Sequence, residues 1–144
     1  MAGPVTAAAV ILPTTFKLPY LNDSKKLTVN QRYSLRPMIE EQALAFAVAH
    51  VYQDEIDQIN ILNASIKAMH LALENLSLKP KFIIVDGNKF KPFQMIPHEC
   101  IIKGDGKFLN IAAASVLAKT YRDDLMKDLD HKHPLYGWKK NKGY

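Results

Sequence analysis

The sequence predicts an α/β or α+β domain in which helices cover a β-sheet. The chain has 144 residues, which is enough for one domain with a hydrophobic core but not for two. Its hydrophobic content of 48% and charged content of 23% are typical of a soluble globular protein. The local patterns follow the order strand, helix, strand, helix, strand, strand, helix, and this order favours a layered architecture.

The first two elements have clear boundaries. Residues Val5 to Leu12 are β-branched near both ends and rich in alanine between them, and Pro13 closes the run, so we predict a buried strand. Thr28 and Gln31 have the spacing of a capping box, which predicts a helix that begins there and extends to about residue 41.

The segment from Leu44 to Tyr52 is ambiguous. Its three alanines and the preceding Ala43 favour a helix by propensity, whereas Leu44, Phe46 and Val48 alternate with them at the period of a strand. We predict a strand. A helix follows, because five apolar residues recur in steps of three and four until Lys79-Pro80 ends the pattern, namely Leu62, Ile66, Met69, Leu73 and Leu76.

The second half of the chain predicts two strands and a long helix. The strands cover Lys81 to Asp86 and Met95 to Lys103. The helix begins near Asn110 and places six residues along one side, namely Ile111, Ser115, Ala118, Arg122, Leu125 and Leu129. Its alanines at 112–114 would allow close approach to a sheet. The last segment, His133 to Tyr144, contains leucine, proline and aromatic residues.

Charge and cysteine content indicate what kind of partner the protein could bind and in which compartment it could work. The net charge of +5 and the pI of about 9.3 suit a polyanionic partner but do not require one. Cys100 is the single cysteine, so an internal disulfide is excluded and a reducing compartment is favoured. Residues 1–12 lack the basic region of a signal peptide, and no apolar run approaches the ~18 residues of a membrane span. We therefore expect a soluble cytoplasmic protein.

Two aspartates follow predicted strands. Asp86-Gly87 and Gly104-Asp105-Gly106 each have the composition of a turn, and that is one interpretation of both. The other is a ligand site, because ligands collect outside the carboxyl ends of strands in sheets covered by helices. If the two strands are neighbours, Asp86 and Asp105 would face one point, and two carboxylates there suit Mg²⁺ or Mn²⁺.

A basic loop is the third candidate feature. Asp23-Ser24-Lys25-Lys26 precedes the helix at residue 28, and most runs of this kind are solvated loops. A hydroxyl and ammonium groups beside a helix start would also bind phosphate. Lys103, Lys107 and Lys119 would extend this basic surface.

Ordered motifs along the whole chain carry a family resemblance. They are AGPV at 2–5, LNDSKKL at 21–27, EID at 55–57, NIL at 60–62, AS at 64–65, AM at 68–69, DGN at 86–88, KGD at 103–105, IAAAS at 111–115, LAK at 117–119, RD at 122–123, PLYG at 134–137 and KGY at 142–144. In this order and spacing they resemble bacterial ribonuclease HII, a family that cleaves RNA in RNA–DNA hybrids and at single ribonucleotides embedded in DNA.

The resemblance implies a ribonuclease H-like fold, with a mixed sheet flanked by helices, and an endonuclease that uses two metal ions, Mn²⁺ or Mg²⁺. Asp86 and Asp105 match the two later members of the family's four carboxylates, so they would bind metal and take part in catalysis. Asp123 lies further down its helix, and we expect a structural role for it. Ser24, Lys25 and Lys26 match the phosphate-binding loop. Tyr144 matches the tyrosine that stacks on the sugar at the RNA–DNA junction.

The sequence departs from the family pattern at both ends. The family's first strand, with its Asp-Glu pair and Gly-Arg-Gly segment, has no counterpart before Ala2, and its terminal helices have none after Tyr144. The resemblance therefore implies a single truncated catalytic domain over residues 1–144, monomeric and inactive or nearly so alone. Two alternatives stay open: a non-catalytic hybrid-binding fragment, and a fragment of the related ribonuclease HIII.

Overall fold

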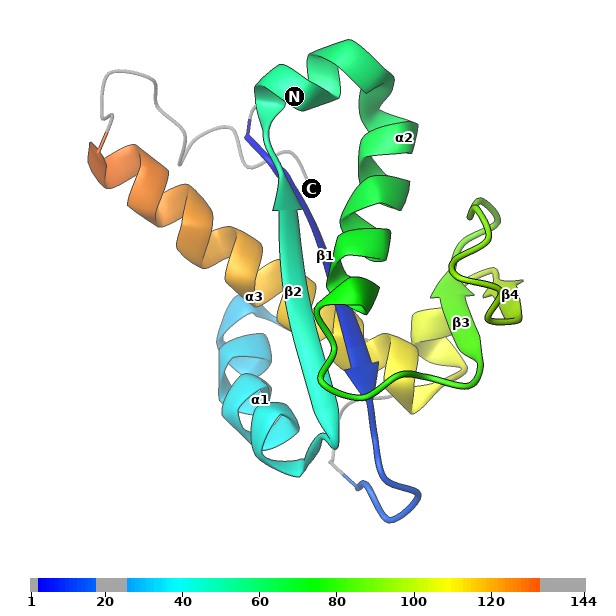
Figure 1. The fold of residues 1–144 in the computed structure, drawn as a ribbon. Helices are drawn as coiled ribbons and strands as arrows, with labels where there is room; N and C mark the ends of the chain where they lie inside the picture. The colour runs from blue at the N-terminus through cyan, green and yellow to red at the C-terminus, as the bar shows by residue number, and fades with distance from the viewer. Residues whose placement is uncertain (1–2, 18–25, 133–144) are drawn as a thin grey trace.

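The computed structural model describes residues 3–17 and 26–132 (Figure 1). Its elements are β1 (Val5–Ile11), α1 (Val29–Gln42), β2 (Ala45–Val51), α2 (Gln53–Glu74), β3 (Ile83–Asp86), β4 (His98–Ile101) and α3 (Leu109–Lys132). A single 3₁₀ turn, Gly104–Gly106, lies between β4 and α3. The predicted order of elements is therefore confirmed, including the strand at 45–51 for which the sequence patterns conflicted.

The strands form two separate pairs. β1 pairs antiparallel with β2 in a register that runs from Val5↔Val51 to Ile11↔Ala45. β3 pairs in parallel with β4 from Ile83↔His98 to Asp86↔Ile101. The α/β class with antiparallel and parallel strands is confirmed. A continuous sheet is not formed among the described residues, because β1 and β3 are not hydrogen-bonded to each other.

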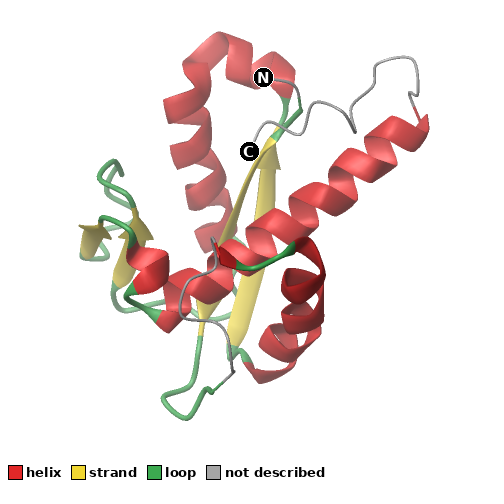
Figure 2. Cartoon of the chain, turned by 180° about the vertical axis from the view of Figure 1, so that it is seen from behind, coloured by secondary structure: helices red, strands yellow, loops and turns green. Residues whose placement is uncertain are grey.

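Helices cover both faces of the β1–β2 pair. On one face, Ala8 and Val10 of β1 pack with Leu35 and Ile39 of α1 and with four buried residues of α3, namely Ala112, Ala113, Val116 and Leu117. On the other face, Val5, Ala7 and Val51 pack with α2. Figure 2 shows the same layers from behind, with α3 crossing the strands. The alanines at 112 and 113 are fully buried, so the expected close approach of this helix to the strands is confirmed.

Three expectations about burial and boundaries are wrong. β1 is only half-buried along its whole length, because the described part of the chain gives it a neighbouring strand on just one edge. Leu62 is exposed, and Leu76 lies beyond the end of α2 at Glu74, so the helical stripe is shorter than the spacing suggested. The predicted strand at 95–103 contracts to His98–Ile101.

A tight turn explains the shorter strand. Gln94 and Met95 adopt positive φ angles of 49° and 63°, which L-residues rarely adopt. The chain reverses there, and Phe93 pairs with Ile96 in an isolated bridge. Met95 therefore lies at an exposed tip instead of beginning a strand.

Polar side chains cap the backbone at two places, the start of α1 and the interruption of α2. Thr28 accepts a hydrogen bond from the Gln31 backbone, and the Gln31 side chain accepts one from the Thr28 backbone, which confirms the capping box. Asn60 interrupts α2 with φ 70° and ψ 168°, and its side chain accepts a hydrogen bond from the backbone of Asn63.

Within the described ranges, no helix combines the length and apolar character needed to cross a membrane.

Candidate functional site

The two candidate aspartates lie at one end of the parallel strand pair. Asp86 is the last residue of β3, and Asp105 lies in the 3₁₀ turn that follows β4. Because the strands are parallel neighbours, their carboxyl ends lie at the same edge, which is the condition that the sequence analysis set for a shared site. The Gly104 backbone N–H donates a hydrogen bond of 2.9 Å to Asp86 Oδ1. The structure therefore brings the two segments into direct contact.

The turn that carries Asp105 is tightly constrained. Lys103 has a left-handed φ of 55°, and the amides of Gly106 and Lys107 donate to the carbonyls of Lys103 and Gly104 at 3.1 Å and 2.9 Å. A Cβ on Gly104 would lie 2.5 Å from Ile111 Cδ1, which is closer than real contacts allow. A side chain at this position would require Ile111 to shift, and the observed packing places the Gly104 amide against Asp86.

The two carboxylates differ in their environment. Asp86 is exposed, whereas Asp105 is only 3% exposed. Carboxylate oxygens are the hard ligands that Mg²⁺ and Mn²⁺ prefer, so the donor chemistry fits the expected ions. Across residues 3–17 and 26–132, however, no three or more His, Cys, Asp or Glu side chains gather closely enough to hold a metal ion. Asp86 and Asp105 would thus supply part of a donor set.

Four of the lysines that the sequence analysis singled out lie among the described residues. Lys103 and Lys107 flank the 3₁₀ turn and are exposed, and Lys119 is half-buried on α3. Lys26 is exposed just before the Thr28 cap. Ser24, Lys25 and Tyr144 lie outside the described residues, so their expected roles stay predictions.

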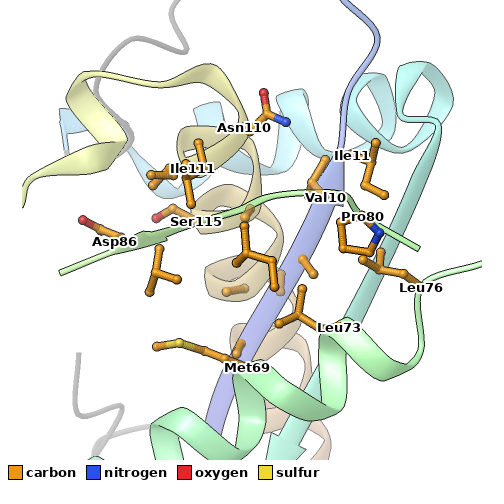
Figure 3. A pocket seen from close by; sticks show the side chains of 18 of the residues that line it. Val10, Ile11, Met69, Leu73, Leu76, Pro80, Asp86, Asn110, Ile111 and Ser115 are labelled. Atoms are coloured by element: carbon orange, nitrogen blue, oxygen red, sulfur yellow. The ribbon is translucent and has the colours of Figure 1, made fainter. Parts of the chain in front are cut away.

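A partly open cavity of about 460 Å³ is lined by residues of β1, α2, β3 and α3, including Asp86. Figure 3 shows side chains of β1, α2 and α3 around it, with Ile111 and Ser115 on the same side as Asp86. The sequence patterns did not reveal this cavity, because it depends on how β1 and β3 lie relative to each other. Nor did they reveal the Gly104 amide, since the glycines around Asp105 indicated only a turn.

Asp123 lies in a different region, and it is 1% exposed. Its neighbour Arg122 donates from Nε to the carbonyl of Pro4 at 3.0 Å, which attaches α3 to the segment before β1. A Cβ on Gly3 would lie 2.5 Å from Met126 Sδ, so the chain passes close to α3 here. This burial supports the structural role expected for Asp123.

The contact between α1 and α3 carries the clearest electrostatic effects. Burial raises the pKa of Tyr33, and a hydrogen bond to Asp124 raises it further. Burial alone would raise the pKa of Asp124, but hydrogen bonds from Tyr33 and Arg36 outweigh it and hold that pKa below its ordinary value. These groups form an inter-helix contact.

Comparisons with known proteins agree on one family. A family model described as ribonuclease HII matches residues 1–144. The chain is 63% identical to the ribonuclease HII of Christiangramia forsetii and 58% identical to that of Phocaeicola vulgatus. All 144 residues are matched in both, and they span 73% and 72% of those relatives.

Two solved structures share the fold. The ribonuclease H2 of Pyrococcus horikoshii superposes with a TM-score of 0.78 at 24% identity, covering 92% of this chain and 71% of that one. The ribonuclease HII in a complex with PCNA from Archaeoglobus fulgidus superposes with a TM-score of 0.70 at 23% identity, covering 91% and 70%. At these identities the likeness concerns the fold alone.

Proposed function

Because this chain belongs to the ribonuclease HII family of nucleases, we propose that it carries part of the active site of a metal-dependent endoribonuclease. The substrate is the RNA strand of RNA–DNA hybrids, or a single ribonucleotide embedded in duplex DNA, and the products end in 5′-phosphate and 3′-hydroxyl. The observation that carries the proposal is the contact between Asp86 and the Gly104 amide, which joins the two acidic segments. With ribonuclease HII as the matched family, the ribonuclease HIII alternative is set aside.

Asp86 and Asp105 are the proposed metal-binding and catalytic residues. Two Mn²⁺ or Mg²⁺ ions bound in the complete site would stabilise the attacking water and the leaving 3′ oxygen. The role of this chain is to hold the carboxylates in place. The Gly104 amide orients Asp86, and the packing of Gly104 on Ile111 fixes that amide.

The basic surface is the proposed contact with nucleic acid. Ser24, Lys25 and Lys26 would bind phosphate, and Tyr144 would stack at the RNA–DNA junction. The net charge of +5 supports attraction to a polyanion. We propose a monomeric cytoplasmic protein in which residues 1–144 form one ribonuclease H-like domain.

We further propose that these 144 residues alone are inactive or nearly so, because no cluster of three potential ligands exists among the described ones. A duplex with one embedded ribonucleotide, incubated with the chain and Mn²⁺, should stay uncleaved over hours. Multiple turnovers at a rate typical of enzymes, about 1 s⁻¹ or faster, would contradict this proposal.

Metal binding separates the enzymatic proposal from its alternative, a non-catalytic hybrid-binding fragment. Calorimetric titration with Mn²⁺ should show weak binding that Asp86→Asn abolishes. Asp54→Asn, at an exposed position on α2, is the control and should leave the binding unchanged. If Mn²⁺ binding does not depend on Asp86, while hybrid duplexes bind without metal and with strong salt dependence, the alternative is correct.

A further inference from the structure

Lys103 adopts a backbone conformation that lysine rarely adopts. Its φ of 55° and ψ of 41° lie in the left-handed region, where the Cβ of an L-residue crowds the backbone carbonyl oxygen. Glycine avoids this cost because it has no Cβ, and asparagine is several-fold enriched in this region. A residue that served only the turn would be less strained as glycine or asparagine. The turn alone therefore does not explain a lysine at this position.

Hydrogen bonds on both sides hold Lys103 in this conformation. Before it, the Ile101 carbonyl accepts a hydrogen bond of 2.9 Å from the Gly87 amide. After it, the Gly104 amide donates to Asp86 Oδ1, also at 2.9 Å. Strained residues persist only where the surrounding structure fixes them, and they cluster at functional sites. The observed strain therefore marks Lys103 as a candidate for a functional role.

Lys103 lies beside both acidic segments of the candidate site. It immediately precedes Gly104, whose amide bonds to Asp86, and it lies two positions before Asp105. Its side chain is exposed. Among the side chains that the structure describes, no carboxylate forms an ion pair with it. The ammonium group is thus available to a ligand that approaches this end of the strand pair.

Phosphate is the ligand that this arrangement favours. Two carboxylates repel a phosphate group, and an ammonium group beside them offsets part of that repulsion. Lysine binds phosphate as a compact point charge with three donors. Because hydrogen bonds fix the backbone on both sides of Lys103, the direction in which its Cβ leaves the chain is fixed as well.

We propose that Lys103 is a phosphate-binding residue of the candidate site, and that its left-handed backbone directs the ammonium group to a nucleic-acid phosphate at Asp86 and Asp105. This inference rests on the proposed function, because it requires a nucleic acid at these carboxylates. It deepens that function by giving one lysine a specific contact in place of a general contribution to the basic surface. Lys107, after the same turn, has an ordinary φ of −116°, so the argument does not extend to it.

Replacement by glycine tests the strain. Lys103→Gly should raise the midpoint of thermal unfolding by about 2–5 °C, because glycine adopts a left-handed conformation without the Cβ contact. A lower midpoint would overturn the proposal, because the lysine would then be explained by stability alone.

Binding to an RNA–DNA hybrid tests the phosphate contact. Fluorescence anisotropy is measured with the full 144-residue chain in EDTA, so that no metal contributes. Lys103→Gly and Lys103→Asn should each weaken binding about fivefold near 100 mM salt, and each should reduce the slope of log Kd against log salt by about 1. Lys103→Arg keeps the charge and should bind within about twofold of the unaltered chain.

Lys79→Asn is the matched control for the loss of one positive charge. Lys79 is exposed and lies before β3, at the end of that strand away from Asp86. Since salt screens charges that lie more than about 10 Å away, this change should alter hybrid binding by less than about twofold. A loss equal to that of Lys103→Asn would show that only net charge matters, and would overturn the proposal.

The remaining outcomes separate this inference from the proposed function. If the unaltered chain binds the hybrid with strong salt dependence and the Lys103 variants bind equally well, the inference is wrong and the proposed function stands. If the unaltered chain does not bind the hybrid at all, the proposed nucleic-acid contact and this inference fail together.

A gain in thermal stability combined with a loss of hybrid binding is the result that supports the inference. A purely structural role for Lys103 would not produce that combination.

Discussion

At the scale of single residues, Gly104 decides how the candidate site is held together. Its amide donates to Asp86, and its α-carbon packs so closely on Ile111 that a side chain here would displace Ile111 Cδ1. The Asp-Gly and Gly-Asp-Gly patterns were sufficient to identify Asp86 and Asp105 as candidates, because strand ends are where ligands collect. They did not reveal the hydrogen bond between the two segments, because it depends on the parallel pairing of β3 and β4.

The first residue-scale prediction concerns this contact. Gly104→Ala should lower the free energy of unfolding by about 1–3 kcal/mol, because the new methyl group collides with Ile111 Cδ1. In an Ile111→Val background, which removes that atom, the same change should be at least about 1 kcal/mol less destabilising. Urea unfolding of the four proteins in this cycle measures the coupling. Additive effects would show that the clash does not control this position.

At the scale of elements, local signals predicted both ends of α1 and the start of α3 to within about one residue, but not the bounds of α2 or β4. The Thr28 capping box was identified from its spacing alone, because its hydrogen bonds join residues three apart. The end of α2 and the length of β4 were misjudged. In both places apolar residues continue beyond the end of the element. Hydrophobic periodicity therefore does not indicate where the backbone leaves the helix or strand.

The cap of α1 gives an element-scale prediction. Thr28→Ala should destabilise the protein by about 1 kcal/mol, because it leaves the Gln31 amide without its partner. Ser34→Ala is the control on the same helix. Its hydroxyl only bonds back to the Asn30 carbonyl, so this change should be neutral within about 0.5 kcal/mol. Equal effects of the two changes in thermal unfolding would contradict the role of the cap.

The interruption of α2 gives a second prediction at the scale of elements. Asn60 has φ 70° and ψ 168°, a region that glycine adopts far more readily than other residues. Asn60→Gly should therefore stabilise the protein by about 1 kcal/mol, whereas Asn60→Ala should destabilise it by about 1–2 kcal/mol through lost capping and greater strain. Denaturant unfolding of both variants measures the difference, and a more stable alanine variant would rule out the strain.

At the scale of the whole molecule, a polar contact joins α1 to α3 over the β1–β2 pair. Asp124 of α3 accepts hydrogen bonds from Tyr33 at 2.7 Å and from Arg36 at 2.5 Å. The Arg36 guanidinium also lies 3.6 Å from the centre of the Tyr121 ring. This contact connects segments about 90 positions apart in the sequence, and no local pattern could predict it.

This contact predicts an acid-sensitive contribution to stability. The pKa of Asp124 is held below its ordinary value of 3.8 in the folded chain, so its contribution is present above about pH 4 and is lost as pH falls through the lower folded value. Since the Asp124 side chain is 45% exposed, the contribution is about 0.5–1 kcal/mol after screening by solvent. Asp124→Asn should lower stability by that amount at pH 7 and by less at pH 3, where the contribution has begun to be lost.

Unfolding curves at both pH values measure this difference. Glu99→Gln, at an exposed position on β4, is the control and should change stability by less than about 0.5 kcal/mol at either pH. An Asp124→Asn effect of the same size at pH 3 and pH 7 would show that ionisation of Asp124 is not the cause.

The sequence by itself determined the order of the elements, the α1 cap, the family and the two candidate aspartates. All of these rest on residues close together in the chain or on ordered motifs. Only the tertiary structure decided that the strands form two separate pairs, that the Gly104 amide holds Asp86, and that a cavity separates β1 from β3. The physical reason is that strand pairing and cavity formation depend on backbone edges from distant segments, and hydrophobic periodicity reports which face of an element is buried but not which edge is paired.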